Sequence, residues 1–167
     1  FDLLRTNNLL VKQRKSYHVT TNSNHWMKKY PNLIKDLEPL GPNHVWVSDI
    51  TYWKTKGGHY YISFITDAYS RKIVGYHVAD TMEAVESVTA LKRAIKTLRP
   101  GAEGLIHHSD RGSQYCSSAY VKTLKNKDIK ISMTENGDPL ENAIAERING
   151  IIKGEYLFDY EIKSLSK

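Results

Sequence analysis

Three carboxylates occupy positions where an ionised side chain could do chemistry. Asp49 lies inside a predicted strand rich in valine, isoleucine and tryptophan, where an uncompensated charge is costly. Asp110 directly follows another predicted strand, and sites in open α/β sheets gather at such strand ends. Glu146 lies on the last predicted helix. Taken singly, Asp110 also fits a turn or cap residue, and Asp49 a structural hydrogen bond.

As a set, these three side chains suit a hard divalent cation. Carboxylate oxygens are preferred ligands of Mg²⁺ and Mn²⁺, whereas thiolates favour softer metals. Two such ions, roughly 3.5–4 Å apart, can activate an attacking oxygen and stabilise the leaving one in phosphodiester cleavage. The chain has one cysteine, Cys116, which excludes a cysteine zinc cluster and an intramolecular disulfide. The reducing cytoplasm fits this cysteine content.

The elements that must hold these residues follow an α/β order. β-branched and aromatic runs predict the strands, and apolar residues at three- and four-residue steps predict the helices. The expected strands are 45–53, 59–66, 71–78, 104–108 and 129–133, and the first two expected helices are 84–98 and 120–127. The order βββαβαβα begins with an antiparallel meander and continues with α/β units.

The last helix has a well-marked start and two different faces. Asp138 is the expected N-cap, Pro139 the first helical residue, and Glu141 the partner of the cap three residues later. Apolar residues at helical spacing predict a buried stripe: Leu140, Ile144, Ile148 and Ile151. The opposite face is polar, and helical geometry alone predicts that it is solvated: Asn142, Glu146, Asn149 and Lys153.

Positive charge gathers near the N-terminus. The 167 residues carry a formal charge of +6, and residues 1–40 contribute +4, from seven basic and three acidic side chains. Such an arm is typical of proteins that neutralise nucleic-acid phosphates, although a solvated leader would have the same composition. No apolar run approaches the roughly 18 residues of a membrane-spanning helix. We therefore expect no membrane partner.

Three sequence blocks resemble the DDE catalytic core of bacterial insertion-sequence transposases, relatives of retroviral integrases. The blocks are WVSDITY at 46–52, HSDRGSQY at 108–115 and NAIAER at 142–147. Between Asp110 and Glu146 lie 35 residues, the spacing that names the D,D(35)E signature. The chain is similar in particular to the second-frame product of the insertion-sequence-three group, over about Pro42 to Glu155. Arg147 stands where serine is common, which affects fine contacts rather than the metal site.

The resemblance implies a ribonuclease-H-like fold, a mixed five-stranded sheet in the order 3-2-1-4-5 with helices on both faces. It implies that Asp49, Asp110 and Glu146 are the catalytic residues and the ligands of two Mg²⁺ or Mn²⁺ ions. The implied reaction is cleavage of a transposon end to leave a 3′-hydroxyl, which then attacks another phosphodiester. The expected DNA contacts are Lys153, which matches a basic family residue, with Asn142, Asn149, Arg111, Arg14 and Lys15.

The resemblance also divides the chain. We expect a basic N-terminal arm or linker at 1–41, an integrase-like catalytic core at 42–157 and a truncated C-terminal segment at 158–167. Because the chain begins with Phe1 and lacks the family's usual helix-turn-helix, we expect a fragment. Expected partners are transposon-end and target DNA, further copies of the chain on DNA, and the first-frame product of the same element. The expected location is the bacterial cytoplasm, at the nucleoid.

Other functions stay open at this point. A catalytically idle DNA-binding or assembly fragment would keep the fold, as would a ribonuclease-H-type nuclease, because fold does not fix function. His107 and His108 are adjacent in a predicted strand and so face opposite sides, which argues against a shared zinc ion. The spacing from His108 to Arg111 is also that of tyrosine recombinases, but no second arginine block accompanies it.

Overall fold

Five strands form one mixed sheet in the computed structural model, which describes residues 2–7, 23–55, 58–99, 103–135 and 142–156. The strand order is β3-β2-β1-β4-β5, which confirms the expected order. The strands are β1 (Val45–Thr55), β2 (Gly58–Asp67), β3 (Ile73–Ala79), β4 (Ile106–Ser109) and β5 (Lys130–Met133). The first three pair antiparallel, and β4 runs parallel to both β1 and β5.

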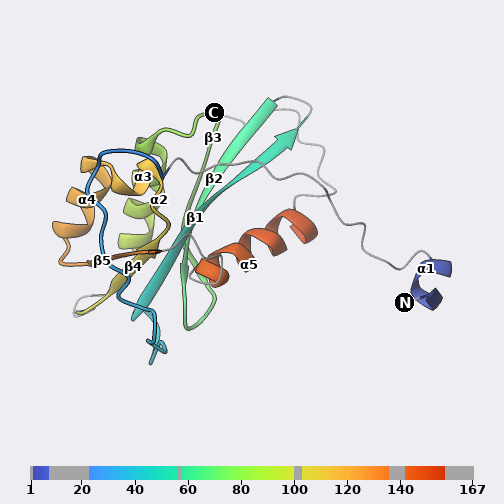
Figure 1. Ribbon diagram of the computed structural model, residues 1–167, viewed down its shortest axis with the longest axis horizontal. Coiled ribbons are helices and arrows are strands. Elements are labelled where there is room, and N and C mark those ends of the chain that lie inside the picture. Colours follow the sequence, from blue (N-terminus) through green and yellow to red (C-terminus); the bar gives the residue numbers. More distant parts are fainter. Residues whose placement is uncertain (1, 8–22, 56–57, 100–102, 136–141, 157–167) are drawn as a thin grey trace.

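Helices cover both faces of the sheet, as expected. They are α2 (Ala84–Ile95), α3 (Ser113–Cys116), α4 (Ser118–Lys125) and α5 (Ala143–Ile151), which a π-helical turn (Ile152–Tyr156) extends. A short helix, α1 (Asp2–Thr6), precedes them in the chain. In Figure 1, α2, α3 and α4 lie on one side of the sheet and α5 on the other. No helix in these described ranges is long and apolar enough to cross a membrane.

The central strand β1 divides its side chains between two cores. Trp46 and Ile50 pack into the larger core, beneath α2, α3 and α4. Val45 and Val47 pack into a smaller core with Ala145 of α5. Because side chains alternate along a strand, Asp49 belongs to the face that α5 covers.

Helix α2 approaches β3 most closely at Gly75. A Cβ atom added to Gly75 would lie 2.6 Å from the carbonyl oxygen of Ala90 and 2.7 Å from both the nitrogen and the Cβ of Ala94. Backbone atoms cannot move aside as the end of a flexible side chain can. Glycine at this position is therefore what allows the helix to rest on the strand.

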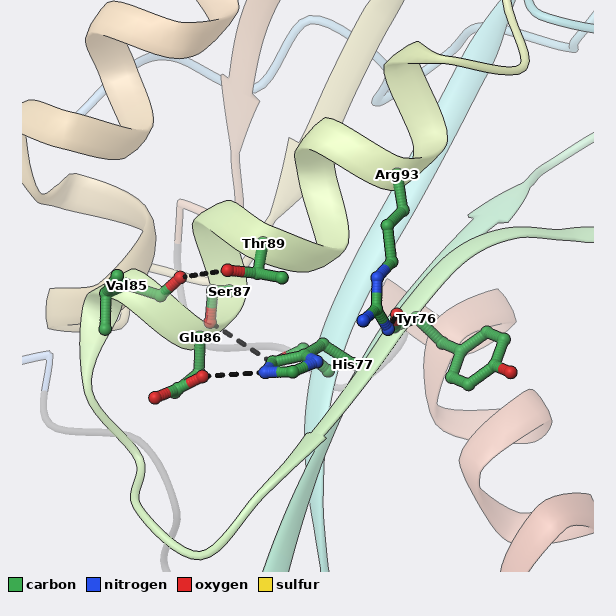
Figure 2. Close-up of polar contacts among 8 residues, drawn as sticks. Tyr76, His77, Val85, Glu86, Ser87, Thr89 and Arg93 are labelled. Carbon is green, nitrogen blue, oxygen red and sulfur yellow. Dashed lines mark hydrogen bonds and ion pairs between the residues drawn. The ribbon is translucent and has the colours of Figure 1, made fainter. Parts of the chain in front are cut away.

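Two polar contacts beside this close approach also join α2 to β3 (Figure 2). Nε2 of His77 on β3 lies 2.8 Å from Oε2 of Glu86 on α2. Further along the helix, Nη1 of Arg93 donates to the carbonyl oxygen of Tyr76 at 2.9 Å. These contacts fix the register of the helix along the outer strand.

The segment 23–44 runs along the β5 edge of the sheet before β1 begins, and it is drawn in blue in Figure 1. The backbone N–H of Leu33 donates to Oγ of Ser132 at 2.8 Å, and that of Met133 donates to the carbonyl oxygen of Pro31 at 3.2 Å. An edge strand otherwise offers unpaired backbone groups to other chains. The segment thus covers part of that edge.

Two strands begin later than predicted. The third strand starts at Ile73 rather than Arg71, because Arg71 has φ 63° and belongs to the preceding turn. The fourth strand starts at Ile106, two residues after Gly104, which has φ 80°. In both cases a left-handed residue ends the turn and delays the extended backbone.

The helices differ from the prediction mainly at their starts. The short helix α3 was not predicted, and α4 begins before Tyr120 because Oγ of Ser117 caps it by accepting from the Tyr120 N–H. Helix α2 ends at Ile95. The predicted capping residues of the last helix lie outside the described residues: Asp138, Pro139 and Glu141.

Candidate active site

Asp49 lies within β1 and is hydrogen-bonded at both carboxylate oxygens. Its Oδ1 accepts from the backbone N–H of Ile50 at 2.8 Å. Its Oδ2 accepts from Nδ2 of Asn149 on α5 at 2.6 Å. The side chain is therefore held between its own strand and the helix that covers it.

Asp110 lies level with Asp49 on the neighbouring strand. The parallel register pairs Val47 with His108, and Asp49 and Asp110 each follow two residues later. Oδ1 of Asp110 accepts from the Gly112 N–H at 2.8 Å, an Asx-type turn that fixes the carboxylate just beyond the end of β4. Asp49, within β1, and Asp110, directly after β4, thus lie side by side at the end where β4 stops.

Glu146 lies on α5, exposed, and its charge reaches Asp49. Burial raises the pKa of Asp49 from 3.8 to about 7, and the negative charges of Asp110 and Glu146 add to the rise. Hydrogen bonds from Ile50 and Asn149 oppose it. The structure therefore brings the three predicted carboxylates into one electrostatic neighbourhood. Within the described ranges, however, no three acidic, histidine or cysteine side chains are close enough together to hold a metal ion.

Helix α5 buries the two asparagines of its predicted polar face, so the prediction of a solvated face is wrong for these positions, whereas Glu146 is exposed as predicted. Asn142, Ala145 and Asn149 are buried. The isoleucines of the predicted buried stripe are only half-buried: Ile144, Ile148 and Ile151. The reason is that the sheet presents acceptors here, and Nδ2 of Asn142 donates to the Ser48 carbonyl oxygen at 3.1 Å while Asn149 donates to Asp49.

The donor set fits a divalent cation. The three carboxylates repel one another, and a cation bound between them would reduce this repulsion. Carboxylate oxygens are the ligands that Mg²⁺ prefers. Asn142 Oδ1 and Asn149 Oδ1 are buried and have no hydrogen-bond partner among the described residues. These amide oxygens can accept from water or substrate at the same place.

Lys153 lies in the π-helical turn after α5, on the same side of the helix as Asn149. Its Nζ lies 4.4 Å from the ring centroid of Tyr52 on β1, a cation–π contact. Burial lowers the pKa of Lys153, while Tyr52 and Asp49 oppose the change. The side chain is half-buried, so the prediction of a solvated face is wrong for Lys153 as well. Such turns recur at functional sites.

Arg111, directly after Asp110, is held by the N-terminal segment. Nε2 of His25 donates to the carbonyl oxygen of Arg111 at 2.8 Å. A contact between residues 86 positions apart leaves no local sequence pattern, so this role of His25 was not predicted. Arg14 and Lys15, two predicted DNA contacts, lie outside the described residues.

A buried polar cluster lies behind Asp49, on the other face of β1. Nε2 of His107 lies 2.7 Å from Oγ of Ser48 and 2.9 Å from the Tyr120 hydroxyl. Burial lowers the pKa of His107 to about 3, so its ring is neutral. His108 lies instead with its Nδ1 2.8 Å from Oγ of Ser132. The two rings thus have different partners, as expected for adjacent residues that face opposite sides of a strand.

Tyr115, the last residue of the block that contains Asp110, packs in the core beneath α2, α3 and α4. Its hydroxyl is buried and has no partner in the described part of the chain. Burial raises the pKa of Tyr115 well above its usual value, and the charges of Asp49, Tyr120 and Asp110 add to this. A neutral phenol thus lies within electrostatic reach of both aspartates.

Comparison with known protein families assigns this chain to one of them. A model of the integrase core domain matches residues 39–139, and a second integrase core domain model matches residues 127–167. The chain belongs to the integrase core family. The predicted resemblance is confirmed.

Relatives and solved structures of integrase core proteins agree with this. The chain is 40% identical over 157 residues to an uncharacterized 31 kDa protein of insertion element IS600 from Shigella sonnei, covering 93% of this chain and 57% of that protein. It is 32% identical over 166 residues to transposase InsF for insertion sequence IS3A of Escherichia coli, covering 95% and 57%. The HTLV-2 integrase catalytic core domain, solved in complex with magnesium, superposes with a TM-score of 0.55 at 27% identity, covering 70% of each chain. This integrase core chain therefore spans little more than half of its two bacterial relatives.

The bond from Asn149 to Asp49 allows a direct test in the metal-free protein. Removing the donor in Asn149→Ala should raise the pKa of Asp49 further, by roughly one pH unit, because that hydrogen bond favours the ionised carboxylate. Carbon-13 NMR of the Asp49 carboxyl group against pH measures the change. Asn126→Ala, an exposed amide at the end of α4, is the control and should leave the midpoint unchanged. An unaltered midpoint in Asn149→Ala would contradict the assigned role.

Proposed function

We propose that this chain is the catalytic core of a DNA transposase, a polynucleotidyl transferase that cuts transposon ends and joins the resulting 3′-hydroxyl to target DNA. The observation that carries the proposal is the level placement of Asp49 and Asp110 on adjacent strands, with the charge of Glu146 acting on the same site. Membership of the integrase core family supports it. The similarity to InsF, a transposase, supports it further.

Asp49, Asp110 and Glu146 would hold two Mg²⁺ or Mn²⁺ ions in the active complex. When bound, these ions would supply Lewis-acid activation of the attacking oxygen and stabilisation of the leaving oxygen. The protein prepares the ligands beforehand. Asn149 and the Ile50 N–H orient the Asp49 carboxylate, and the Gly112 N–H orients that of Asp110.

The proposal includes the partners of the reaction. Transposon-end and target DNA would be bound by basic and amide groups near the site, among them Lys153 and Arg111, and by Arg14 and Lys15 of the N-terminal arm. Further copies of the chain would assemble on DNA, together with the first-frame product of the same element. The reaction would take place in the bacterial cytoplasm, at the nucleoid.

Cleavage of a labelled transposon-end duplex in Mn²⁺ tests the proposed function. We expect a nick that leaves a 3′-hydroxyl at the transposon end, and its loss in Asp110→Asn. Mn²⁺ should also raise the melting temperature of the wild type but not of Asp110→Asn, by mass action on the folded state. DNA binding without any cleavage would identify an idle assembly fragment. Cleavage of the RNA strand of a hybrid, with DNA left intact, would identify a ribonuclease-H-type nuclease.

Lys153→Ala should weaken binding to a transposon-end duplex and slow its cleavage, while Mn²⁺ affinity stays near that of the wild type. The physical reason is that an ammonium beside Asp49 can hold a phosphate near the scissile bond without binding metal. We expect a loss of roughly tenfold in DNA affinity, the value of one charged hydrogen bond. Fluorescence anisotropy and a gel cleavage assay measure the two effects.

Lys122→Ala supplies the matched control for Lys153→Ala, because Lys122 is exposed on α4, on the opposite face of the sheet. Both substitutions remove one positive charge. If they reduce cleavage equally, Lys153 is an ordinary surface lysine and the proposed contact does not exist.

A further inference from the structure

A fully exposed tryptophan lies next to the loop that carries Asp110. Trp26 is 95% exposed, whereas Trp46 is completely buried. The residue before it, His25, donates to the carbonyl oxygen of Arg111 at 2.8 Å. Trp26 is therefore the next residue after one that contacts that loop directly. An exposed aromatic ring at such a place is available to stack on a ligand.

The segment around Trp26 is anchored rather than loose. His25, Met27 and Tyr30 are half-buried, and Met27 and Tyr30 pack against the core beneath α2, α3 and α4. The residues between them face outward. We call these exposed residues the Trp26 patch: Trp26, Lys28 and Lys29. The ring is thus held outward by a backbone that is fixed on both sides, so presenting it costs little further ordering.

The two lysines of the Trp26 patch place positive charge near the candidate active site. Burial and then the negative charge of Asp110 raise the pKa of the Cys116 thiol, and the positive charges of Lys29 and Arg111 oppose the rise. Lys29 therefore lies in electrostatic contact with the segment that runs from Asp110 to Cys116. Nζ of Lys28, two residues after Trp26, lies 5.3 Å from the ring centroid of Tyr30.

We propose that Trp26 stacks on an unpaired base of DNA held at the active site, while Lys28 and Lys29 contact the adjoining phosphates. The inference rests on the proposed function and adds a binding site to it. An exposed aromatic face with basic side chains in the same patch is an arrangement that binds single-stranded nucleic acid, because every base has a π-face and every nucleotide a phosphate. A base within an intact duplex offers no free face, so the partner is an unpaired base.

A second copy of the chain is a less suitable partner for the Trp26 patch. Two copies of the patch would bring four lysine side chains together, and the chain already carries a net charge of +6. Like charges at such a contact repel, whereas DNA phosphates neutralise them.

Binding of a labelled short duplex with a single-stranded tail, compared with the same duplex without the tail, tests the inference. EDTA in the buffer prevents cleavage. Trp26→Ala should bind the tailed duplex roughly tenfold more weakly than the wild type, the effect of one base–aromatic stack, and the blunt duplex nearly as well. Trp26→Phe should keep most of the affinity, because its ring can still stack. Leu40→Ala, which removes another exposed apolar side chain (85%) of the same segment, is the control and should bind like the wild type.

Tryptophan fluorescence provides a second readout on the same samples. The tailed duplex should quench the wild type more strongly than Trp26→Phe, since of the two remaining tryptophans Trp46 is buried and Trp53 is half-buried. Equal binding of the tailed duplex by wild type and Trp26→Ala would overturn the inference and leave the proposed function intact. Equal weakening on both duplexes would exclude stacking on an unpaired base, and a change of oligomeric state in Trp26→Ala would show that a second copy covers the ring. A wild type that binds neither duplex would overturn the proposed function together with the inference.

Discussion

Asp49→Asn should abolish cleavage of a transposon end and, in the absence of metal, stabilise the protein above neutral pH. Loss of one carboxylate ligand should slow cleavage by a factor on the order of a thousand or more, because metal stabilisation of transition-state charge is worth several kcal/mol. The fold should survive, since Oδ1 of Asn149 is buried without a partner among the described residues, and a flipped Asn149 amide can accept from the amide that the substitution introduces. A gel assay and thermal melts measure the two effects.

The stabilisation by Asp49→Asn should depend on pH in a definite direction. The pKa of Asp49 is about 7 in the folded protein, against 3.8 for the ordinary carboxyl group. The folded state therefore keeps a proton that the unfolded chain releases, and wild-type stability falls as pH rises from about 4 to about 7. The variant does not lose stability in this way, so its melting temperature should exceed that of the wild type by on the order of 10 °C at pH 8, but not at pH 4.

Asp80→Asn is the matched control for this pH dependence, because Asp80 is exposed just after β3. It should change neither cleavage nor the pH dependence of the melting temperature. If Asp49→Asn has the same stability difference at pH 4 and pH 8, the raised pKa is wrong. If it still cleaves DNA at the wild-type rate, Asp49 is not a ligand of the catalytic metal.

Gly75→Ala should be the most destabilising conservative substitution in the sheet. The added methyl group would meet the Ala90 carbonyl oxygen and the Ala94 nitrogen at distances that backbone atoms do not tolerate. Helix α2 must then move away from β3, which strains the two polar contacts between them (Figure 2). We expect a loss of about 2–4 kcal/mol in the free energy of unfolding, at the upper end of overpacking effects. Urea denaturation followed by circular dichroism measures it.

Gly150→Ala is the matched control, with the opposite expected sign. Gly150 is in α5 and exposed, and an added Cβ would have no atom within 4 Å. Alanine should therefore stabilise the protein by roughly 0.5–1 kcal/mol, the cost of glycine in a helix. A Gly75→Ala variant as stable as the wild type would contradict the close approach of α2 to β3.

The sheet could be predicted from the sequence because its signals are local. The run from Val45 to Trp53 has the composition of an interior strand, and the structure extends it by only two residues. The resemblance supplied the strand order, which alternation alone could not. The sequence did not predict the local backbone conformation at the turns or the short helix α3. Nothing in the composition around Arg71 or Gly104 fixes a left-handed φ, and α3 is too short to have a periodic pattern.

The residues of the site were predicted, but the burial of two of them was not. The spacing of Asp110 and Glu146 pointed to the carboxylates, and the register places Asp110 level with Asp49. The burial of Asn142 and Asn149 was not predicted, because a helical wheel assumes that the neighbouring surface is apolar. Here the surface offers the Asp49 carboxylate and a strand carbonyl, so burying two asparagines satisfies more hydrogen bonds than burying isoleucines.

The packing of α5 on the sheet has a consequence for how the site is put together. Asp49 lies in a strand of the sheet and Asp110 directly after one, whereas α5 rests on the sheet through Ala145, two buried asparagines and a half-buried Ile144. An element with so little buried apolar surface detaches at a fraction of the global unfolding free energy. Folding of the sheet and docking of α5, which carries Glu146, are therefore separable steps. Any DNA contact that stabilises the docked position of α5 therefore increases the fraction of molecules in which Asp49, Asp110 and Glu146 are close together.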